Sequence, residues 1–433
     1  MTSQKMVFSG VSNIMVHNAI QSKGFIKKIR LNEAIEIVLK NFDLFPSHEI
    51  KLQDYIIIDK ILRIDIRSNR NVPSFNRSAM DGFAVRSKDT TLASHKNPVT
   101  LKVIDELNIG QKPNRRVEKG TAIKIPTGGV MPLEADAVVK IENTIPFSPS
   151  EINIIKPIIA TKNLSEVGED IKKGRILFKA GHRFRIFDRG FLLSAGVEKV
   201  VVTKTPTLAI LSTGDELVEP WKPKMEIGQV PEVNSINVFD SSLREGWKSK
   251  IIGIIPDNLE TLKKAVQEAL ASYDVVLLSG GTSVGTKDYI PILFDELGEL
   301  LFHGVSIRPG KPISAAKIQN KLVFGLPGYP VAALLTFQFI VKPVILSLMG
   351  LKPSEIPTIK AKISIDVKSQ LNRLDFLRVK LQKDSEQKFK AIPISISGSG
   401  VLSTIVEADG IVIIPEAVET LQKDDDVDVF LIK

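Results

Sequence analysis

The sequence predicts a multidomain α/β protein with a central doubly wound, mostly parallel sheet, a β-rich inserted domain, a mixed N-terminal domain and a C-terminal β-barrel or sandwich. Three observations predict this architecture. The chain has 433 residues, about three times the length of an ordinary domain. Between residues 206 and 352, apolar strand-like runs alternate with helical patterns, which is typical of a parallel sheet covered by helices. Residues 71–157 and 353–433 instead contain short apolar runs separated by Gly, Pro and Asn, which is typical of all-β regions.

The composition narrows the possible partners. Hydrophobic residues form 43% of the chain and charged residues 25%, as in an ordinary soluble protein with a sizeable core. The net charge of +9 favours anionic partners such as phosphorylated small molecules. Nucleic acid is not expected as a partner, because aromatic residues form only 6% of the chain, the cations are dispersed and no nucleic-acid-binding motif is present.

The chain contains no cysteine, and its five histidines are scattered. Disulfides, thiolate metal sites and cysteine nucleophiles are therefore excluded, and a transition-metal site is not expected, whereas a hard cation held by carboxylates stays open. Residues 331–350 are apolar and of membrane-spanning length, but they include Gln338, Lys342 and Pro343, which favours a buried helix. Since the start of the chain has no apolar signal segment, we expect a cytoplasmic protein with no membrane partner.

The first two domains come from the first half of the chain. Residues 1–70 together with 158–205 are predicted to form the mixed domain, and residues 71–157 the inserted β-rich domain. In the mixed domain the apolar spacing predicts a helix over residues 31–44, a strand over residues 55–66 and a helix after Phe187. In the β-rich domain strands are expected at residues 99–103, 121–125 and 137–141.

The second half is predicted to form the α/β domain, residues 206–352, and the C-terminal β-barrel, residues 353–433. The α/β domain has strand-like runs at residues 208–211, 250–255 and 275–278, and helical patterns at residues 233–245 and after Pro256-Asp257-Asn258. Such sheets bind ligands at the carboxyl ends of their strands. Glycine-containing turns fall at three expected strand ends, residues 212–214, 279–281 and 326–328. The barrel strands are expected at residues 360–367, 375–381 and 410–414.

Two acidic segments are candidates for chemistry. Asp81 precedes a glycine between apolar residues, which fits either a functional carboxylate or a local turn capped by Asp81. In residues 212–216, Asp215 and Glu216 follow Gly214. Backbone N–H groups there could face an anion, and the carboxylates could hold a hard cation. The alternative is a helix N-terminus at which the acids interact with the helix dipole.

Two further segments could bind an anion. Residues 279–288 combine small residues with four hydroxyl groups, which favours a phosphate cradle, although the segment is neither a Walker A nor a Rossmann fingerprint. Arg308 and Lys311 lie in a loop stiffened by Pro309, Gly310 and Pro312; they could bind phosphate or belong to a solvated turn. No nucleophile elbow is present. Together the segments predict metal-assisted handling of a phosphorylated ligand.

Ten segments, in this order and spacing, resemble the molybdopterin molybdenumtransferase family, which includes the E domain of gephyrin. They are residues 73–86, 126–129, 135–139, 168–171, 212–217, 279–289, 308–312, 326–330, 398–400 and 414–416. The resemblance runs from about residue 26 to the end. It implies a four-part subunit, a homodimer and an enzyme that inserts molybdenum or tungsten from the oxyanion into adenylylated molybdopterin, with Mg²⁺ assisting and AMP released. It also implies a molybdopterin adenylyltransferase as the upstream partner.

The resemblance assigns site residues one by one. The catalytic acidic and polar members are Asp81, Thr127, Asp170, Glu216 and Asp288, of which Asp81, Glu216 and Asp288 are the metal candidates. The cofactor-binding residues are Ser212, Thr213, Gly214, Ser279, Gly280, Gly281, Ser283, Arg308, Lys311, Arg378 and Ser399. In the dimer, Asp81 and Thr127 would face the sheet crevice of the other subunit.

Departures from the family pattern leave the choice between molybdate and tungstate open. Phe83 replaces a common Tyr, and Tyr329 a frequent Asn. Two alternatives also stay open: an enzyme related to molybdopterin adenylyltransferase, which would not need the segment around Asp81, and a non-catalytic cofactor carrier or scaffold, in which the acids would be dispensable.

Overall fold

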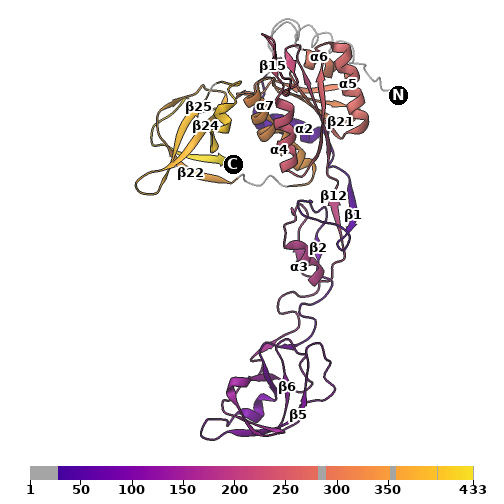
Figure 1. Cartoon of the computed structure of the whole chain (residues 1–433), viewed down its shortest axis with the longest axis vertical. Helices are drawn as coiled ribbons and strands as arrows, with labels where there is room; N and C mark the ends of the chain where they lie inside the picture. The colour runs from indigo at the N-terminus through magenta and orange to yellow at the C-terminus, as the bar shows by residue number, and fades with distance from the viewer. Residues whose placement is uncertain (1–27, 281–288, 352–356, 397, 433) are drawn as a thin grey trace, which may run out of the picture. The chain divides into compact units, whose positions relative to one another are not determined.

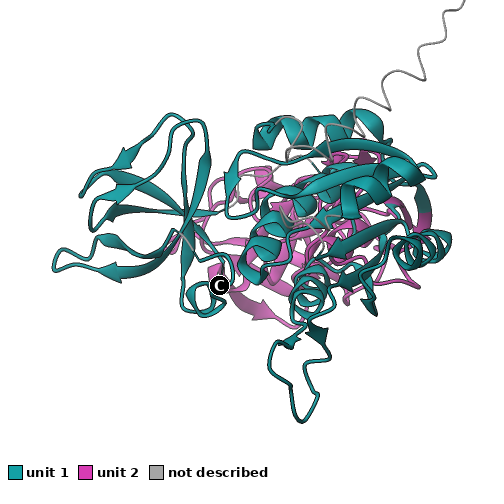
Figure 2. Ribbon diagram, turned by 90° about the horizontal axis from the view of Figure 1, so that it is seen from above, with its two compact units in different colours: residues 1–48, 59–61, 203–433 teal, residues 49–58, 62–202 magenta. Residues whose placement is uncertain are grey.

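The computed structural model describes residues 28–280, 289–351, 357–396 and 398–432. The chain forms two compact units (Figures 1 and 2). Unit 1 comprises residues 1–48, 59–61 and 203–433, and unit 2 comprises residues 49–58 and 62–202. The division into four domains stays a prediction, because both the sheet domain and the C-terminal barrel belong to unit 1.

A six-stranded sheet forms the centre of unit 1, in the order β16-β13-β17-β21-β20-β18. The first four strands are parallel, and β20 and β18 add an antiparallel edge. Their bounds are β13 Thr207–Thr213, β16 Lys248–Ile255, β17 Val275–Ser279, β18 Glu299–His303, β20 Ser314–Ile318 and β21 Lys321–Leu326. The predicted, mostly parallel sheet is confirmed. The three glycine-containing turns follow the ends of β13, β17 and β21, so they lie at one edge of this sheet.

Helices cover both faces of the sheet, because successive apolar residues of each strand enter different cores. Leu208 and Ile210 belong to one core with the helices α2 (Leu31–Asn41), α4 (Asn234–Arg244), α7 (Pro330–Thr336) and α8 (Lys342–Leu348). Ala209 and Leu211 belong to the other core, with α5 (Leu259–Ser272) and α6 (Tyr289–Leu297). Helix α5 begins where predicted, since the Asn258 side chain accepts hydrogen bonds from the N–H groups of Glu260 (3.0 Å) and Thr261 (3.2 Å).

One helical stretch is long and apolar enough to cross a membrane. It spans Pro330–Leu348, with 19 residues and a mean hydropathy of 2.0. Its three parts are α7, a π-helical segment at Phe337–Val341 and α8. The structure buries 67% of this stretch, and residues such as Phe337 and Ile345 pack in the first core. The stretch is therefore a core helix of the sheet domain, as predicted.

The C-terminal part of unit 1 is a closed five-stranded barrel. The strands pair in the ring β24-β25-β22-β28-β26, and β26 pairs again with β24. Their bounds are β22 Thr358–Ile363, β24 Leu374–Lys383, β25 Phe389–Ser395, β26 Gly410–Ile414 and β28 Asp426–Leu431. Strand β19 (Ile307–Arg308), which follows the sheet edge in sequence, pairs in parallel with β24 and thereby joins the sheet domain to the barrel.

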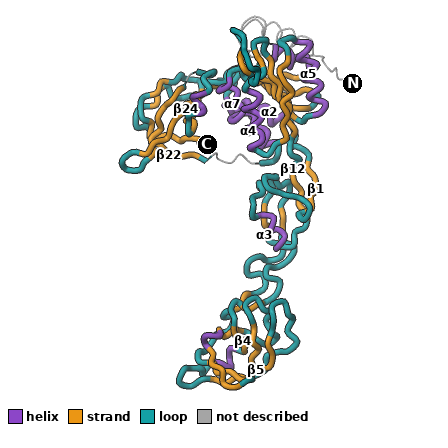
Figure 3. The backbone as a smooth tube through the Cα atoms, viewed as in Figure 1, coloured by secondary structure: helices purple, strands orange, loops and turns teal. Residues whose placement is uncertain are grey.

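Unit 2 consists mainly of strands and loops (Figure 3). Its six-stranded sheet has the order β7-β4-β6-β5-β9-β8. The bounds are β4 Gly82–Val85, β5 Val99–Glu106, β6 Thr121–Ile125, β7 Ala137–Lys140, β8 Thr144–Ser148 and β9 Glu151–Ile154. The predicted β-rich segment and the helix after Phe187, α3 (Asp188–Ser194), are confirmed.

The strand predicted at residues 55–66 is wrong. The structure has turns and isolated bridge residues at Ile61 and Leu62, of which Leu62 pairs with Val202, followed by the two-residue strand β2 (Ile66–Arg67). The chain passes between the two units in this segment. Its isoleucines therefore reflect separate packing contacts, with Ile57 and Leu62 buried in unit 2 and Ile61 buried in unit 1.

Candidate active site

The strand ends of unit 1 approach one another closely at Gly280. This glycine has a φ of 109°, and a Cβ atom there would lie 1.9 Å from the carbonyl oxygen of Thr213. Only glycine permits this approach of β17 to β13. The approach brings Ser279 and Gly280 together with Ser212 and Thr213, as expected for a cradle built at the carboxyl ends of the strands.

Asn234 ties the strand ends together and was missed by the sequence analysis. Its Nδ2 donates to Ser279 Oγ (2.9 Å) and to the Gly328 carbonyl (2.8 Å). Its Oδ1 and the Ser212 hydroxyl are buried, and neither has a hydrogen-bond partner within the described ranges. Buried polar atoms of this kind are rare unless a ligand or water satisfies them. They indicate a place for a polar ligand.

Glu216 lies beyond these strand ends, where the chain forms β14 (Leu217–Val218) instead of a helix. The alternative of a helix N-terminus at residues 212–216 is therefore wrong. The Glu216 carboxylate folds back over Gly214, where a Cβ atom would lie 2.9 Å from Oε2. Its backbone carbonyl accepts a hydrogen bond from Val230 N–H (2.9 Å), which fixes the residue beside the pocket described next.

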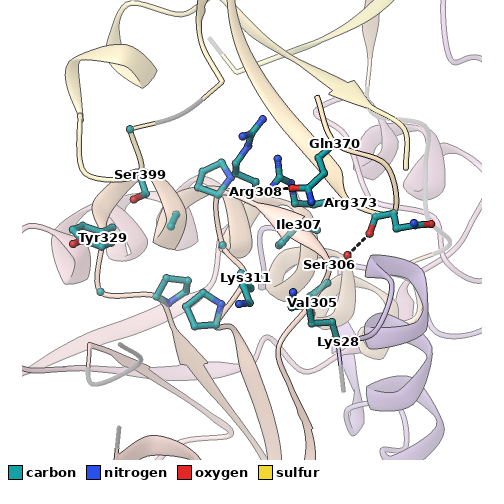
Figure 4. A pocket seen from close by; sticks show the side chains of 18 of the residues that line it. Lys28, Val305, Ser306, Ile307, Arg308, Lys311, Tyr329, Gln370, Arg373 and Ser399 are labelled. Carbon is teal, nitrogen blue, oxygen red and sulfur yellow. Dashed lines mark hydrogen bonds between the residues drawn. The ribbon is translucent and has the colours of Figure 1, made fainter. Parts of the chain in front are cut away.

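A pocket of about 1120 Å³ lies between the sheet edge and the barrel of unit 1 (Figure 4). Its described lining contains four cationic side chains and one carboxylate, Glu216. The cations are Lys28, Arg308, Lys311 and Arg373. The other lining residues include Gly280, Gly328, Tyr329, Gln370 and Ser399. Ser399 is held by its carbonyl, which accepts a hydrogen bond from Val331 N–H at the start of α7 (3.0 Å). The charge balance of this lining favours an anionic ligand.

The cations of this region are destabilised by burial and by one another. The pKa of Lys311 is lowered by burial and then by the neighbouring Lys28 ammonium. The side chain of Arg378 is fully buried, and burial followed by repulsion from Arg308 lowers its pKa to about 10. Arg378 therefore stays charged at neutral pH. A bound anion would relieve this repulsion.

The loop that carries Arg308 and Lys311 is not a solvated turn. Arg308 Nη2 forms an ion pair with Asp375 Oδ2 at 2.5 Å, and Asp375 is fully buried in the barrel strand β24. Gly310, with a φ of 117°, passes so close to α7 that a Cβ atom would lie 2.5 Å from Thr336 Cγ2. The loop is thus built into the joint between sheet and barrel, and both cations face the pocket.

Unit 2 carries three of the predicted site residues. Asp81 Oδ1 accepts hydrogen bonds from the Thr127 N–H (2.7 Å) and hydroxyl (3.0 Å). The backbone bond and then the hydroxyl bond lower the pKa of Asp81. The alternative that Asp81 caps a local turn is wrong, because within the described residues its carboxylate accepts from Thr127, 46 residues later, and from no neighbouring N–H group. Asp170 is exposed, and within the described residues no hydrogen bond joins it to Asp81 or Thr127.

Three predicted residues, Gly281, Ser283 and Asp288, lie outside the described residues. Within the described ranges, no group of three or more His, Asp or Glu side chains could hold a metal ion. Of the three metal candidates, Asp81 belongs to unit 2 and Glu216 to unit 1. The joint placement of the three carboxylates therefore stays a prediction.

The fold and the pocket define a class of protein: an α/β domain with an anion pocket at its strand ends, combined with a β-rich unit and a C-terminal barrel. Three family models match the chain in this order. They are the MoeA N-terminal region (domains I and II) at residues 29–196, a probable molybdopterin binding domain at residues 209–347, and the MoeA C-terminal region (domain IV) at residues 360–432.

Similar proteins extend over nearly the whole chain. A putative molybdopterin biosynthesis protein of Methanocaldococcus jannaschii is 34% identical, covering 93% of this chain and 98% of its own. A molybdopterin molybdenumtransferase of Bacillus subtilis is 32% identical and covers 94% of each chain. The solved structure of a molybdopterin biosynthesis MoeA protein from Pyrococcus horikoshii has a TM-score of 0.81 at 36% identity, covering 94% of this chain and 100% of that one. The chain belongs to the molybdopterin molybdenumtransferase family, whose function is molybdenum insertion.

Proposed function

We propose that the chain inserts molybdenum from its oxyanion into adenylylated molybdopterin and releases AMP. The observation that supports this most is the cationic pocket of unit 1, which lies at the strand ends of the domain matched by the molybdopterin-binding model. Both substrates are anions, and the lining offers Arg308 and Lys311 to their oxygen atoms. Arg offers a planar two-donor fork and Lys a point charge.

The strand-end residues would hold the phosphorylated cofactor. The cradle comprises Ser212, Thr213, Gly214, Ser279 and Gly280, with Gly281 and Ser283 expected to continue it. Buried hydroxyls and backbone N–H groups at such an edge suit phosphate oxygens. Glu216, beside the cradle, is placed to take up or release a proton during metal insertion. Ser399, which lines the pocket, would complete the site from the barrel, with the fully buried Arg378 behind the lining.

Mg²⁺ is part of the proposal, with Asp81, Glu216 and Asp288 as its candidate ligands. Carboxylate oxygens are the ligands that Mg²⁺ prefers in proteins. When bound, the ion would neutralise charge on the phosphate oxygens. Asp81 suits this role because its lowered pKa keeps the carboxylate ionised.

A homodimer is also part of the proposal, because the family resemblance implies one and the predicted site residues are distributed over two units. Asp81, Thr127 and Asp170 belong to unit 2, whereas the pocket belongs to unit 1. In a dimer, unit 2 of one subunit would complete the pocket of the other. Size-exclusion chromatography with light scattering should give twice the mass of 47.7 kDa; a monomer over the micromolar range would contradict the shared site. We place the reaction in the cytoplasm, downstream of a molybdopterin adenylyltransferase.

A turnover assay tests the proposal. The full chain is given adenylylated molybdopterin and Mg²⁺, with molybdate or tungstate, and AMP release is followed. Release that depends on the oxyanion would support insertion and show which metal is preferred. Binding of the adenylylated pterin without cleavage would contradict the proposal and favour the carrier or scaffold. Adenylylation of free molybdopterin from ATP would favour the adenylyltransferase alternative.

A further inference from the structure

Unit 2 contains a cavity of its own, with a volume of about 780 Å³. Its walls come from Ile104 on β5, from the loop at residues 112–118 and from the segment at residues 130–133. This volume lies within the range of about 300–1,000 Å³ that is usual for sites of small organic molecules. None of the described lining residues belongs to the predicted active site, so the cavity needs a separate explanation.

The loop at residues 112–118 is fixed against the sheet of unit 2. Val117 is buried in a core of this sheet, and its N–H donates to the Leu133 carbonyl (3.0 Å). Arg115 Nη1 donates to the carbonyl of Ile104 (2.9 Å). These two bonds tie the three walls of the cavity to one another. The cavity therefore has its shape before a ligand binds, which lowers the cost of ordering the site on binding.

The charges of the loop favour an anionic ligand. Three cations, Lys112, Arg115 and Arg116, line the cavity, and Glu118 is the one carboxylate among the described lining residues. Arg116 Nε lies 3.6 Å from Glu118 Oε1, but both side chains are more than 60% exposed, so this pair contributes little. Lys112 and Arg115 form no ion pair with any residue that the structure describes. The lining thus has an excess of two positive charges, which attracts anions.

The other walls are apolar and favour a flat ring. Ile104 and Met131 are partly buried against the core of the sheet, whereas Leu133 lines the cavity with 77% of its surface exposed. An inorganic anion would leave this apolar surface uncovered. An aromatic ring would cover it and would gain a favourable contact with the Met131 sulfur. Asn114, also in the lining, has an amide that can donate to and accept from the polar atoms of such a ligand.

We propose that the cavity of unit 2 binds a nucleoside monophosphate, with its phosphate on Lys112 and Arg116 and its base against Met131 and Leu133. This class of ligand combines an anionic group, a sugar with hydroxyl groups and a flat ring, and the lining offers a partner to each. The inference goes beyond metal insertion, because it uses no residue assigned to that reaction and stands whether or not the chain inserts molybdenum.

NMR titration of the full chain with AMP tests the proposal, with the methionine methyl groups labelled. The methyl signal of Met131 should shift and saturate as AMP is added. The methyl of Met349, which is buried in unit 1, should not shift and is the internal reference. Adenosine lacks the anion and inorganic phosphate lacks the ring. Each should bind at Met131 at least about tenfold more weakly than AMP, the effect of losing a hydrogen bond between charged groups or the burial of the ring.

Matched substitutions separate the charged and apolar contributions. Lys112→Gln and Arg116→Gln should each weaken AMP binding at Met131 by about tenfold, the loss of one charged hydrogen bond. Leu133→Asn should weaken it as well, because the base loses an apolar contact. Lys119→Gln and Leu92→Asn make the same changes at exposed positions of unit 2 that do not line the cavity. Both controls should bind AMP as the unsubstituted protein does.

Several outcomes would overturn the proposal. These are an unshifted Met131 methyl in the presence of AMP, equal binding of AMP and adenosine, equal binding of AMP and phosphate, and unchanged affinity in Lys112→Gln and Arg116→Gln. Both of these side chains are exposed, and thermal unfolding should show that the variants fold. The titration contains no pterin and no oxyanion. Absence of oxyanion-dependent AMP release in the turnover assay would therefore contradict the proposed function and leave the cavity of unit 2 unaffected.

Discussion

The Asp81 carboxylate accepts two hydrogen bonds from Thr127, which lies 46 residues later in the chain. Both bonds favour the ionised form, and the pKa of Asp81 is lowered as a result. Because the folded-state pKa lies below the unfolded value, these bonds stabilise the fold above the unfolded pKa, about 3.9. Their contribution is lost as the pH falls through the folded pKa.

We expect Thr127→Val to raise the pKa of Asp81 part of the way towards its ordinary value. The substitution removes the hydroxyl donor and leaves the backbone N–H in place. Carbon-detected NMR titration of the Asp81 carboxyl measures the effect, and Thr127→Ser, which keeps a hydroxyl, serves as the control. An unchanged pKa in Thr127→Val would show that the hydroxyl bond is absent in solution.

Replacing Glu216 with Gln should abolish metal insertion without affecting the fold. The carboxylate lines the pocket and is exposed, so its loss removes a charge but no packing. We expect a decrease of about 10²- to 10⁴-fold in the rate of AMP release, the range for an acid–base group. Glu219→Gln, three residues away and also exposed, is the matched control. Equal rates for both variants and the unsubstituted protein would remove Glu216 from the site.

Gly280→Ala should damage both stability and anion binding. The new Cβ would lie 1.9 Å from the Thr213 carbonyl oxygen, at a φ of 109°, so the ends of β13 and β17 must separate. Strain of this kind costs on the order of 1–3 kcal/mol, before any cost of the clash. Urea unfolding and tungstate titration measure the two effects. At Gly328 a Cβ would meet its nearest neighbour at 3.6 Å, so Gly328→Ala should be the milder change. The reverse order would contradict the close approach of the strand ends.

His303 should make the protein less stable as the pH falls from neutral. Burial and then the nearby Lys311 ammonium lower its pKa to about 4. Below the ordinary pKa near 6.5 the unfolded chain binds a proton that the folded protein does not bind. Stability is therefore lost between about pH 6.5 and pH 4, by up to roughly 3 kcal/mol.

Unfolding free energies of the unsubstituted protein and His303→Gln, measured at neutral pH and near pH 4.5, test this. The variant should lose less stability than the unsubstituted protein over the same interval. The difference between the two proteins isolates His303 from the other titrating groups. Identical pH dependence in both would mean that His303 takes up its proton with an ordinary pKa.

The sheet of unit 1 could be predicted because its signals are local. Apolar runs followed by glycine turns marked β13, β17 and β21, and Asn258 marked the start of α5. The loose alternation of apolar residues at residues 55–66 led to a wrong strand prediction. The isoleucines there pack individually, in two different cores. Local patterns carry no information on which unit a side chain enters.

Of the four cations that line the pocket, the sequence predicted Arg308 and Lys311 but not Lys28 and Arg373, and it did not predict the residues that organise the site. Asn234 bonds to groups 45 and 94 residues away, and Asp375 to Arg308 at a separation of 67. In the sequence, Asp375 stands at the start of an apolar strand and Asn234 within a helical pattern. What distinguishes Asn234 and Asp375 from other polar residues is that both are buried and form hydrogen bonds to residues far away in the sequence. These contacts exist only in the folded protein.

The place of α2 in unit 1 has a consequence for synthesis on the ribosome. This helix ends at Asn41, and its carbonyl there accepts from Lys317 Nζ (2.9 Å), while Phe45 N–H donates to the Leu348 carbonyl (2.8 Å). At about 5–20 residues per second, its partners emerge roughly 10–60 seconds after it. Unit 2 is translated in that interval and is complete first. During this interval the apolar face of α2 has no partner to pack against in the nascent chain. We therefore expect a chaperone to protect this protein most in those seconds.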